Sequence, residues 1–148
     1  MAKRQKPKTT GRVKRGAGSD QNRHRVFVSH ATYDKFVAKV ICDRLRLKRI
    51  DTDRDDRDIE GGDSIPEAIR RMIEQCDELA ILLTPQSIHR EWVLVEIGIA
   101  IGMGKRIVPL LYHVPANSIP EIIRSNRAFD LNELDSYLSD VMKRGVKP

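Results

Sequence analysis

The sequence predicts a single α/β domain in which helices cover both faces of a five-stranded parallel sheet. Short apolar runs alternate with segments whose apolar residues recur every three or four positions, which is the pattern of strands alternating with amphipathic helices. Two of the runs, residues 79–84 and 107–112, are apolar almost throughout, as expected of strands buried on both faces. The length of 148 residues fits one such domain.

The first half of this body holds two predicted strands and two predicted helices. Residues 25–30 form the first strand and residues 50–53 a weaker second one, and a charged loop follows over 55–63. Ser64 and Glu67 form a capping box that starts the second helix. The predicted buried faces are Tyr33, Phe36, Val37, Val40, Ile41 and Leu45 in the first helix, and Ile65, Ile69, Met72, Ile73 and Cys76 in the second.

The second half continues the alternation. A helix is predicted over 90–103, with Gly104 as its C-terminal stop, and a loop or short helix over 115–125. A brief strand over 128–130 leads into a last helix that Asp130 caps and that Leu131, Leu134, Leu138, Val141 and Met142 line. The order predicts a flavodoxin-like three-layer sandwich, whose ligands gather at the carboxyl ends of the strands.

The charge of the chain is concentrated in its first residues. The net charge is +6, yet residues 1–25 alone hold nine Lys or Arg and one acid, which leaves the rest nearly neutral. Residues 1–24 offer almost nothing to bury, so we expect a disordered basic tail followed by a folded domain over 25–145. The tail only weakly suggests nucleic-acid binding, because no aromatic residue interleaves its charges, and a solubilising leader is an equal alternative.

Cys42 and Cys76 match neither a disulfide framework nor a zinc pattern and are expected to be buried thiols in a reducing cytoplasm. No signal peptide and no apolar run long enough to span a membrane is visible. The acidic run from Asp51 to Asp58 does not place Gly and Glu at the positions where a calcium-binding loop has them, so we expect no metal. Phosphate-binding glycine motifs are absent as well.

The predicted helix over 90–103 contains the most informative residue. Residues 92–104 read WVLVEIGIAIGMG, and Glu96 is their only charge. A carboxylate in so apolar a helix is costly unless something stabilises it. Glu96 is therefore either the partner of a buried cation or backbone amide, or a functional carboxylate in a partly desolvated pocket.

Five sequence boxes in this order resemble those of bacterial-type TIR (Toll/interleukin-1 receptor) domains: RVFVSH, DRDIEGGDSI, LAILLTPQS, EWVLVEIGIA and KRIVPLL. The similarity covers residues 25–145. The loop over 55–63 corresponds to the BB loop of that family. Enzymatic members cleave NAD at the nicotinamide glycosidic bond, and their essential Glu lies four residues after a Trp, as Glu96 does after Trp92. Glu91 stands where these members often have a small residue, so the resemblance does not define the residues at the edge of the pocket.

The resemblance implies a site with one catalytic carboxylate, Glu96. Nicotinamide in NAD already carries positive charge and leaves as a neutral molecule, so no general acid is needed and a fixed anion suffices to stabilise the ribose cation. No cofactor is expected, because NAD is the substrate. The residues expected to bind it are Ser29, His30, Tyr33, Asp56, Asp58 and Trp92. Ser29 and His30 alternatively satisfy backbone groups, and Tyr33 alternatively starts the buried face of its helix.

Three functions remain open. The first is a cytoplasmic NAD glycohydrolase or cyclase in bacterial anti-phage defence or NAD depletion, with a possible effector that senses the product. The second is a non-enzymatic module that binds other TIR domains. Self-association is expected in either case, through the apolar helix with Gly98, Ala100 and Gly102. The third is a nucleoside-processing enzyme resembling deoxyribosyltransferases, which also use a carboxylate on a flavodoxin-like sheet.

Overall fold

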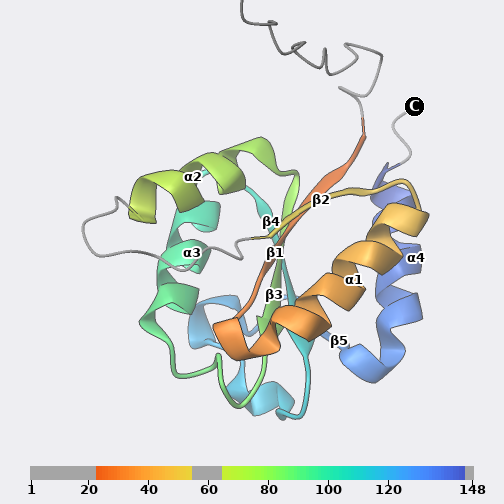
Figure 1. Cartoon of the computed structure of the whole chain (residues 1–148). Helices are drawn as coiled ribbons and strands as arrows, with labels where there is room; N and C mark the ends of the chain where they lie inside the picture. Colours follow the sequence, from red (N-terminus) through yellow and green to blue (C-terminus); the bar gives the residue numbers. More distant parts are fainter. Residues whose placement is uncertain (1–22, 55–64, 146–148) are drawn as a thin grey trace, which may run out of the picture.

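The computed structural model describes residues 23–54 and 65–145, which form a five-stranded parallel sheet in the order β2-β1-β3-β4-β5 (Figure 1). The predicted fold class is confirmed. The central strand β3 pairs with β1 and β4 on either side and is buried along its whole length, which is why its residues after Glu78 are apolar. The strands are β1 (Arg25–Ser29), β2 (Asp51–Arg54), β3 (Glu78–Leu83), β4 (Arg106–Leu111) and β5 (Phe129–Asp130).

Two helices cover each face of the sheet. In Figure 1, α1 (Lys35–Leu47) and α4 (Leu134–Gly145) lie on one side and α2 (Ile65–Gln75) and α3 (Glu91–Gly102) on the other. Single 3-10 turns precede α1 and α4 and fill the link between β4 and β5. They are η1 (Thr32–Asp34), η2 (Ala116–Ser118), η3 (Glu121–Ile123) and η4 (Leu131–Glu133).

The alternation of β3 divides the core into two layers. Ala80 and Leu82 pack with α1 and α4, while Ile81 and its neighbours on the opposite face pack with α2 and α3. Cys42 lies in the first layer and Cys76 in the second, both as free thiols. The prediction of two buried thiols is confirmed, and burial raises the pKa of Cys76 to about 11.

The predicted ends of two helices are also confirmed. Gly104 follows α3 with a φ of 65°, a left-handed conformation that costs glycine little. The Asp130 side chain accepts a hydrogen bond from the Asn132 amide at 2.8 Å and caps the last helical segment. Among the described residues, no helix combines the length and apolarity that a membrane crossing requires.

The predicted buried face of α1 is partly wrong. Tyr33 and Phe36 are 80% and 76% exposed, and Val40 also faces solvent. Tyr33 belongs to η1 rather than to the helix, and the period of 3.6 residues sets the buried face of α1 instead through Ala38, Ile41, Cys42 and Leu45.

Two further apolar positions differ from the prediction. Met142 is exposed on α4, because Tyr137, Leu138 and Val141 supply the buried face of that helix. Ala100, predicted to help a second copy approach, is fully buried within the domain's own core. Gly98 and Gly102 do leave open space around them.

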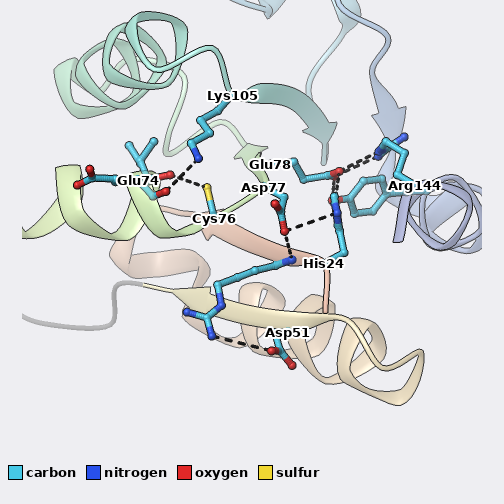
Figure 2. A network of polar contacts seen from close by, with 11 residues as sticks. His24, Asp51, Glu74, Cys76, Asp77, Glu78, Lys105 and Arg144 are labelled. Carbon is cyan, nitrogen blue, oxygen red and sulfur yellow. Dashed lines mark hydrogen bonds and ion pairs between the residues drawn. The ribbon is translucent and has the colours of Figure 1, made fainter. Parts of the chain in front are cut away.

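A buried polar network holds α4 against the amino ends of the strands (Figure 2). Glu78 is fully buried and accepts hydrogen bonds from Arg144 at 2.9 and 3.1 Å, from the Tyr137 hydroxyl at 2.8 Å and from His24 at 3.0 Å. Burial opposes the ionisation of Glu78, but these donors outweigh it and hold the pKa of this carboxyl below its ordinary value of 4.5. His24 is buried here, although the sequence suggested that it belongs to the tail.

Some predictions fall on parts of the chain that the structure does not describe. These are the remaining tail residues 1–22, the loop over 55–63, Ser64 and the Ile65 side chain.

Candidate active site

A small cavity at the carboxyl ends of β1 and β3 contains the acidic residue singled out by the sequence. Its volume is about 90 Å³, and Glu96 of α3 and Ser29 of β1 both line it. This is the edge of a parallel sheet at which ligands bind in this architecture. The lining comprises Ser29, His30, Ala31, Thr32, Ile69, Ser87, Arg90, Trp92, Val93 and Glu96.

The helical period of α3 turns Glu96 inward. Val93, Ile97 and Ala100 are buried on the same face of the helix, at spacings of three, one and four residues from Glu96. Glu96 is accordingly only 8% exposed. The Ser29 hydroxyl donates a hydrogen bond to Glu96 Oε2. A buried carboxylate that is hydrogen-bonded at the rim of a cavity can act on a ligand without the full cost of an unsatisfied charge.

Four predicted site residues, Ser29, His30, Trp92 and Glu96, meet in this cavity. His30 Nδ1 donates to the carbonyl of Ala31 at 2.8 Å, so the backbone role considered for His30 is present beside its place in the cavity lining. Tyr33 does not line the cavity, although it directly follows a cavity residue in the sequence. Its ring is exposed to solvent. Asp56 and Asp58 lie outside the described residues.

Three polar residues of the cavity were not predicted. Thr32 follows β1 within the segment already singled out, whereas Ser87 and Arg90 belong to the loop between β3 and α3. Arg90 places a cation at the cavity, which suits an anionic part of a ligand. The signal that could have found it is its position two residues before Trp92, in a loop that follows the central strand.

A larger cleft of about 730 Å³ lies at the opposite, amino-terminal end of the strands. Lys105, Arg106, Arg127 and Arg144 line it, but none of the predicted site residues does. Lys105 follows α3 and Arg144 ends α4, where cations stabilise the carboxyl ends of helices, and Arg144 is also paired with Glu78. Lys105 and Arg144 therefore have a structural explanation, and size alone does not identify the active site.

The fold and the cavity agree with a comparison against protein families. A family model described as the TIR domain matches residues 26–143, which is most of the chain. The chain belongs to the TIR domain family. The resemblance noted in the sequence is thereby confirmed, and the five boxes fall on β1, the link after β2, β3, α3 and β4.

One similar protein is a probable 2′ cyclic ADP-D-ribose synthase, BdTIR, from Brachypodium distachyon. The two are 24% identical over 126 residues, which make up 82% of this chain and 56% of that protein. The TIR chain thus spans about half the length of this curated relative.

Solved structures with the same fold include a metazoan receptor and two complexes that contain TIR domains. A TIR-STING receptor from C. gigas has a TM-score of 0.65 at 19% identity, over 89% of this chain and 42% of that one. In the RPS4 and RRS1 TIR domain heterodimer the TM-score is 0.64 at 15% identity, over 82% and 98% of the two chains. The TIR domains of the activated Roq1 resistosome give a TM-score of 0.58 at 16% identity, over the same shares. At these identities the likeness establishes the fold.

Proposed function

We propose that this TIR domain cleaves NAD at the bond between nicotinamide and ribose, with Glu96 as the catalytic carboxylate. The observation that carries the proposal is the burial of Glu96 in a polar cavity at the carboxyl edge of the sheet, where Ser29 donates to it. The similarity to a probable 2′ cyclic ADP-D-ribose synthase supports the substrate class.

One carboxylate is enough for this chemistry. The pyridinium ring of NAD is a leaving group that takes the electron pair of the C1′–N bond and departs as neutral nicotinamide, so no proton has to be delivered to it. Positive charge then develops on the ribose ring. A preorganised anion in a water-poor cavity stabilises that charge and can hold the ribose hydroxyls. The hydroxyl of Ser29 keeps the Glu96 carboxylate oriented for this role.

The other residues of the cavity bind the substrate in this proposal. The indole of Trp92 offers a flat apolar wall for the nicotinamide ring, and Arg90 offers a cation for the diphosphate. In this proposal His30, which lines the cavity, and the exposed ring of Tyr33 contact the part of the nucleotide that does not fit into so small a cavity. Asp56 and Asp58 stay in the proposal as contacts from the loop after β2.

Two products are consistent with the mechanism. Attack of water on C1′ gives ADP-ribose and a proton, whereas attack of a hydroxyl of the same molecule gives a cyclic ADP-ribose and a proton.

The proposal extends to the setting of the reaction. NAD is the substrate rather than a cofactor, and a cytoplasmic location suits the two buried thiols. We propose a part in anti-phage defence or NAD depletion, with an effector that senses the product. Nucleic-acid binding by the basic tail is a weaker proposal.

A second candidate function is binding to other TIR domains. Leu94, Val95 and Ile101 are exposed on α3, so an apolar face of this helix meets solvent. Such a face favours a contact surface. Complexes between TIR domains exist for RPS4 and RRS1. Assembly and catalysis are compatible, because a second copy can complete the active site.

The experiment that tests the proposal measures nicotinamide release from NAD by concentrated protein. Glu96→Ala should lower the rate by at least about 100-fold, the effect of removing one preorganised charge-stabilising group. Glu91→Ala is the matched control, because it removes an exposed acid from the first turn of the same helix and should leave the rate within about twofold.

The remaining outcomes separate the candidates. Absence of nicotinamide release at high concentration and under crowding supports the binding module. Release that persists in Glu96→Ala would assign the chemistry to another residue. Release of a base from deoxynucleosides but not from NAD would favour the deoxyribosyltransferase-like alternative.

A further inference from the structure

Asp34 is a buried carboxylate with an unusual partner. It is the residue before α1, where an Asp side chain ordinarily caps the backbone amides of its own helix. Asp130 does this at the start of the last helical segment, but the Asp34 side chain makes no cap bond. Asp34 instead accepts a hydrogen bond at 2.7 Å from the hydroxyl of Thr84, which is 50 residues away in sequence.

Thr84 is the corner of a hydrogen-bonded turn that leads from β3 to α3. Its hydroxyl oxygen accepts from the amides of Gln86 and Ser87 at 3.2 Å, and its own amide donates to the Ser87 hydroxyl at 2.8 Å. The Ser87 hydroxyl donates in turn to the carbonyl of Leu82 at 2.8 Å. The Ser87 carbonyl then accepts from the amide of Arg90, the residue that precedes α3. The turn thus sets where α3 begins.

These contacts join the two walls of the cavity. One wall follows β1, where Ser29 to Thr32 line the cavity and the Asp34 amide closes the turn by donating to the Ala31 carbonyl at 2.9 Å. The other wall is the β3–α3 segment, which supplies Ser87, Arg90 and Trp92. Asp34 and Thr84 are 8% and 2% exposed, so their hydrogen bond is shielded from water and is strengthened by the charge of the carboxylate.

We propose that Asp34 is a positioning residue, which through Thr84 fixes the wall that carries Trp92 and Glu96 against the wall that carries Ser29. The inference rests on the proposed function of the cavity. Asp34 itself does not line the cavity, and it acts on the reaction only through the position of the groups that do. Loss of the hydrogen bond lets α3 move relative to β1, and a misplacement of about 1 Å can cost on the order of 100-fold in rate.

The chain carries its own reporter for this movement. Trp92 is the single tryptophan and lines the cavity, so its fluorescence and its quenching by acrylamide report on the wall whether or not NAD is cleaved. Asp34→Ala and Thr84→Val should raise the acrylamide quenching of Trp92 at unchanged helix content. With NAD, both should lower kcat/KM about tenfold, chiefly through kcat.

Matched variants separate positioning from general loosening. Thr84→Ser keeps the hydroxyl and should stay near the wild type. Asp34→Asn keeps an acceptor oxygen but loses the charge that strengthens the bond, so its effect should be smaller than that of Asp34→Ala. Asp130→Ala removes a helix-start contact elsewhere and should leave the quenching of Trp92 unchanged. Should Asp34→Ala not fold, Thr84→Val removes the same hydrogen bond from the other side.

The inference is overturned if Asp34→Ala and Thr84→Val leave the quenching of Trp92 unchanged, or if Asp130→Ala raises it equally. Failure of the proposed function has a different signature, since a wild-type protein that releases no nicotinamide still gives a clear fluorescence result. Increased quenching together with unaltered kcat and KM in an active enzyme would also contradict a positioning role.

Discussion

Glu96 and Glu78 are both buried acids, but their surroundings differ. Glu78 is matched by an arginine, a tyrosine and a histidine in a closed network far from the cavity, whereas Glu96 lines the cavity itself. Both carboxylates are buried and hydrogen-bonded, but of the two only Glu96 lines the proposed substrate cavity. The environment of each acid, rather than its burial, therefore distinguishes the structural carboxylate from the one proposed to be catalytic.

Tyr33 provides a prediction at the residue scale. Because its ring is 80% exposed and makes no part of the core, Tyr33→Ser should change the free energy of unfolding by less than about 0.5 kcal/mol. If the ring lies against the nucleotide as proposed, KM for NAD should rise while kcat stays constant. Thermal unfolding and steady-state kinetics check the two parts. A large loss of stability would mean that the ring packs against the domain after all.

The helix α3 illustrates the next scale, because its residues serve two surfaces. Its inner face contributes Val93, Glu96, Ile97 and Ala100 to the domain, and its outer face exposes Leu94 and Ile101. Such an apolar outer face is costly in water unless another surface covers it. This arrangement connects the proposed catalytic residue to the surface proposed for assembly within a single element.

Gly98 allows that connection to be tested. A Cβ at Gly98 meets nothing within 4 Å, so Gly98→Ala should stabilise the isolated domain by about 0.5–1 kcal/mol. Gly98→Leu should weaken self-association if a second copy packs closely there, and sedimentation velocity measures this directly. Arg70→Leu, on the exposed side of α2, is a control for added apolar surface and should leave assembly unchanged. Equal assembly of all three variants and the wild type would remove α3 from the interface.

The element boundaries also show what sequence periodicity can and cannot predict. Strands and helices followed from apolar spacing, since this depends on local geometry. Glu96 stood out as the only charge in residues 92–104, and its assignment to a substrate site came from the resemblance to the TIR family. The burial of Asp34, the partners of Glu78 and the exposure of Phe36 did not follow. Each depends on a neighbour 50 or more residues away or on the point at which a helix begins, and a single sequence states neither.

At the scale of the whole molecule, the Glu78 network couples the first and last elements of the described domain. It joins His24, just before β1, to the start of β3 and to the last turn of α4 (Figure 2). Breaking a buried ion pair from one side leaves the other charge without its partner, so Glu78→Gln should destabilise the domain by about 3 kcal/mol at neutral pH. Glu74→Gln, which removes an exposed acid, should have little effect.

The same network predicts how stability depends on pH. Because the pKa of Glu78 is lower in the folded state than its ordinary value of 4.5, its contribution is complete above that value and is lost as the pH falls through the lower, folded-state pKa. The difference in unfolding free energy between wild type and Glu78→Gln should therefore shrink below about pH 4.5. Urea unfolding at a series of pH values measures it. A difference that stays constant down to acid pH would contradict the assignment.

The central claim is that one cavity both binds NAD and cleaves it through Glu96. Proton NMR of a single sample tests both parts, because Trp92 gives the sole indole N–H signal and free nicotinamide gives its own ring signals. With NAD added, the Trp92 signal should shift in wild type and in Glu96→Gln, while nicotinamide should appear only in the wild type. Nicotinamide release by Glu96→Gln at the wild-type rate, or release by the wild type with an unmoved Trp92 signal, would contradict the account.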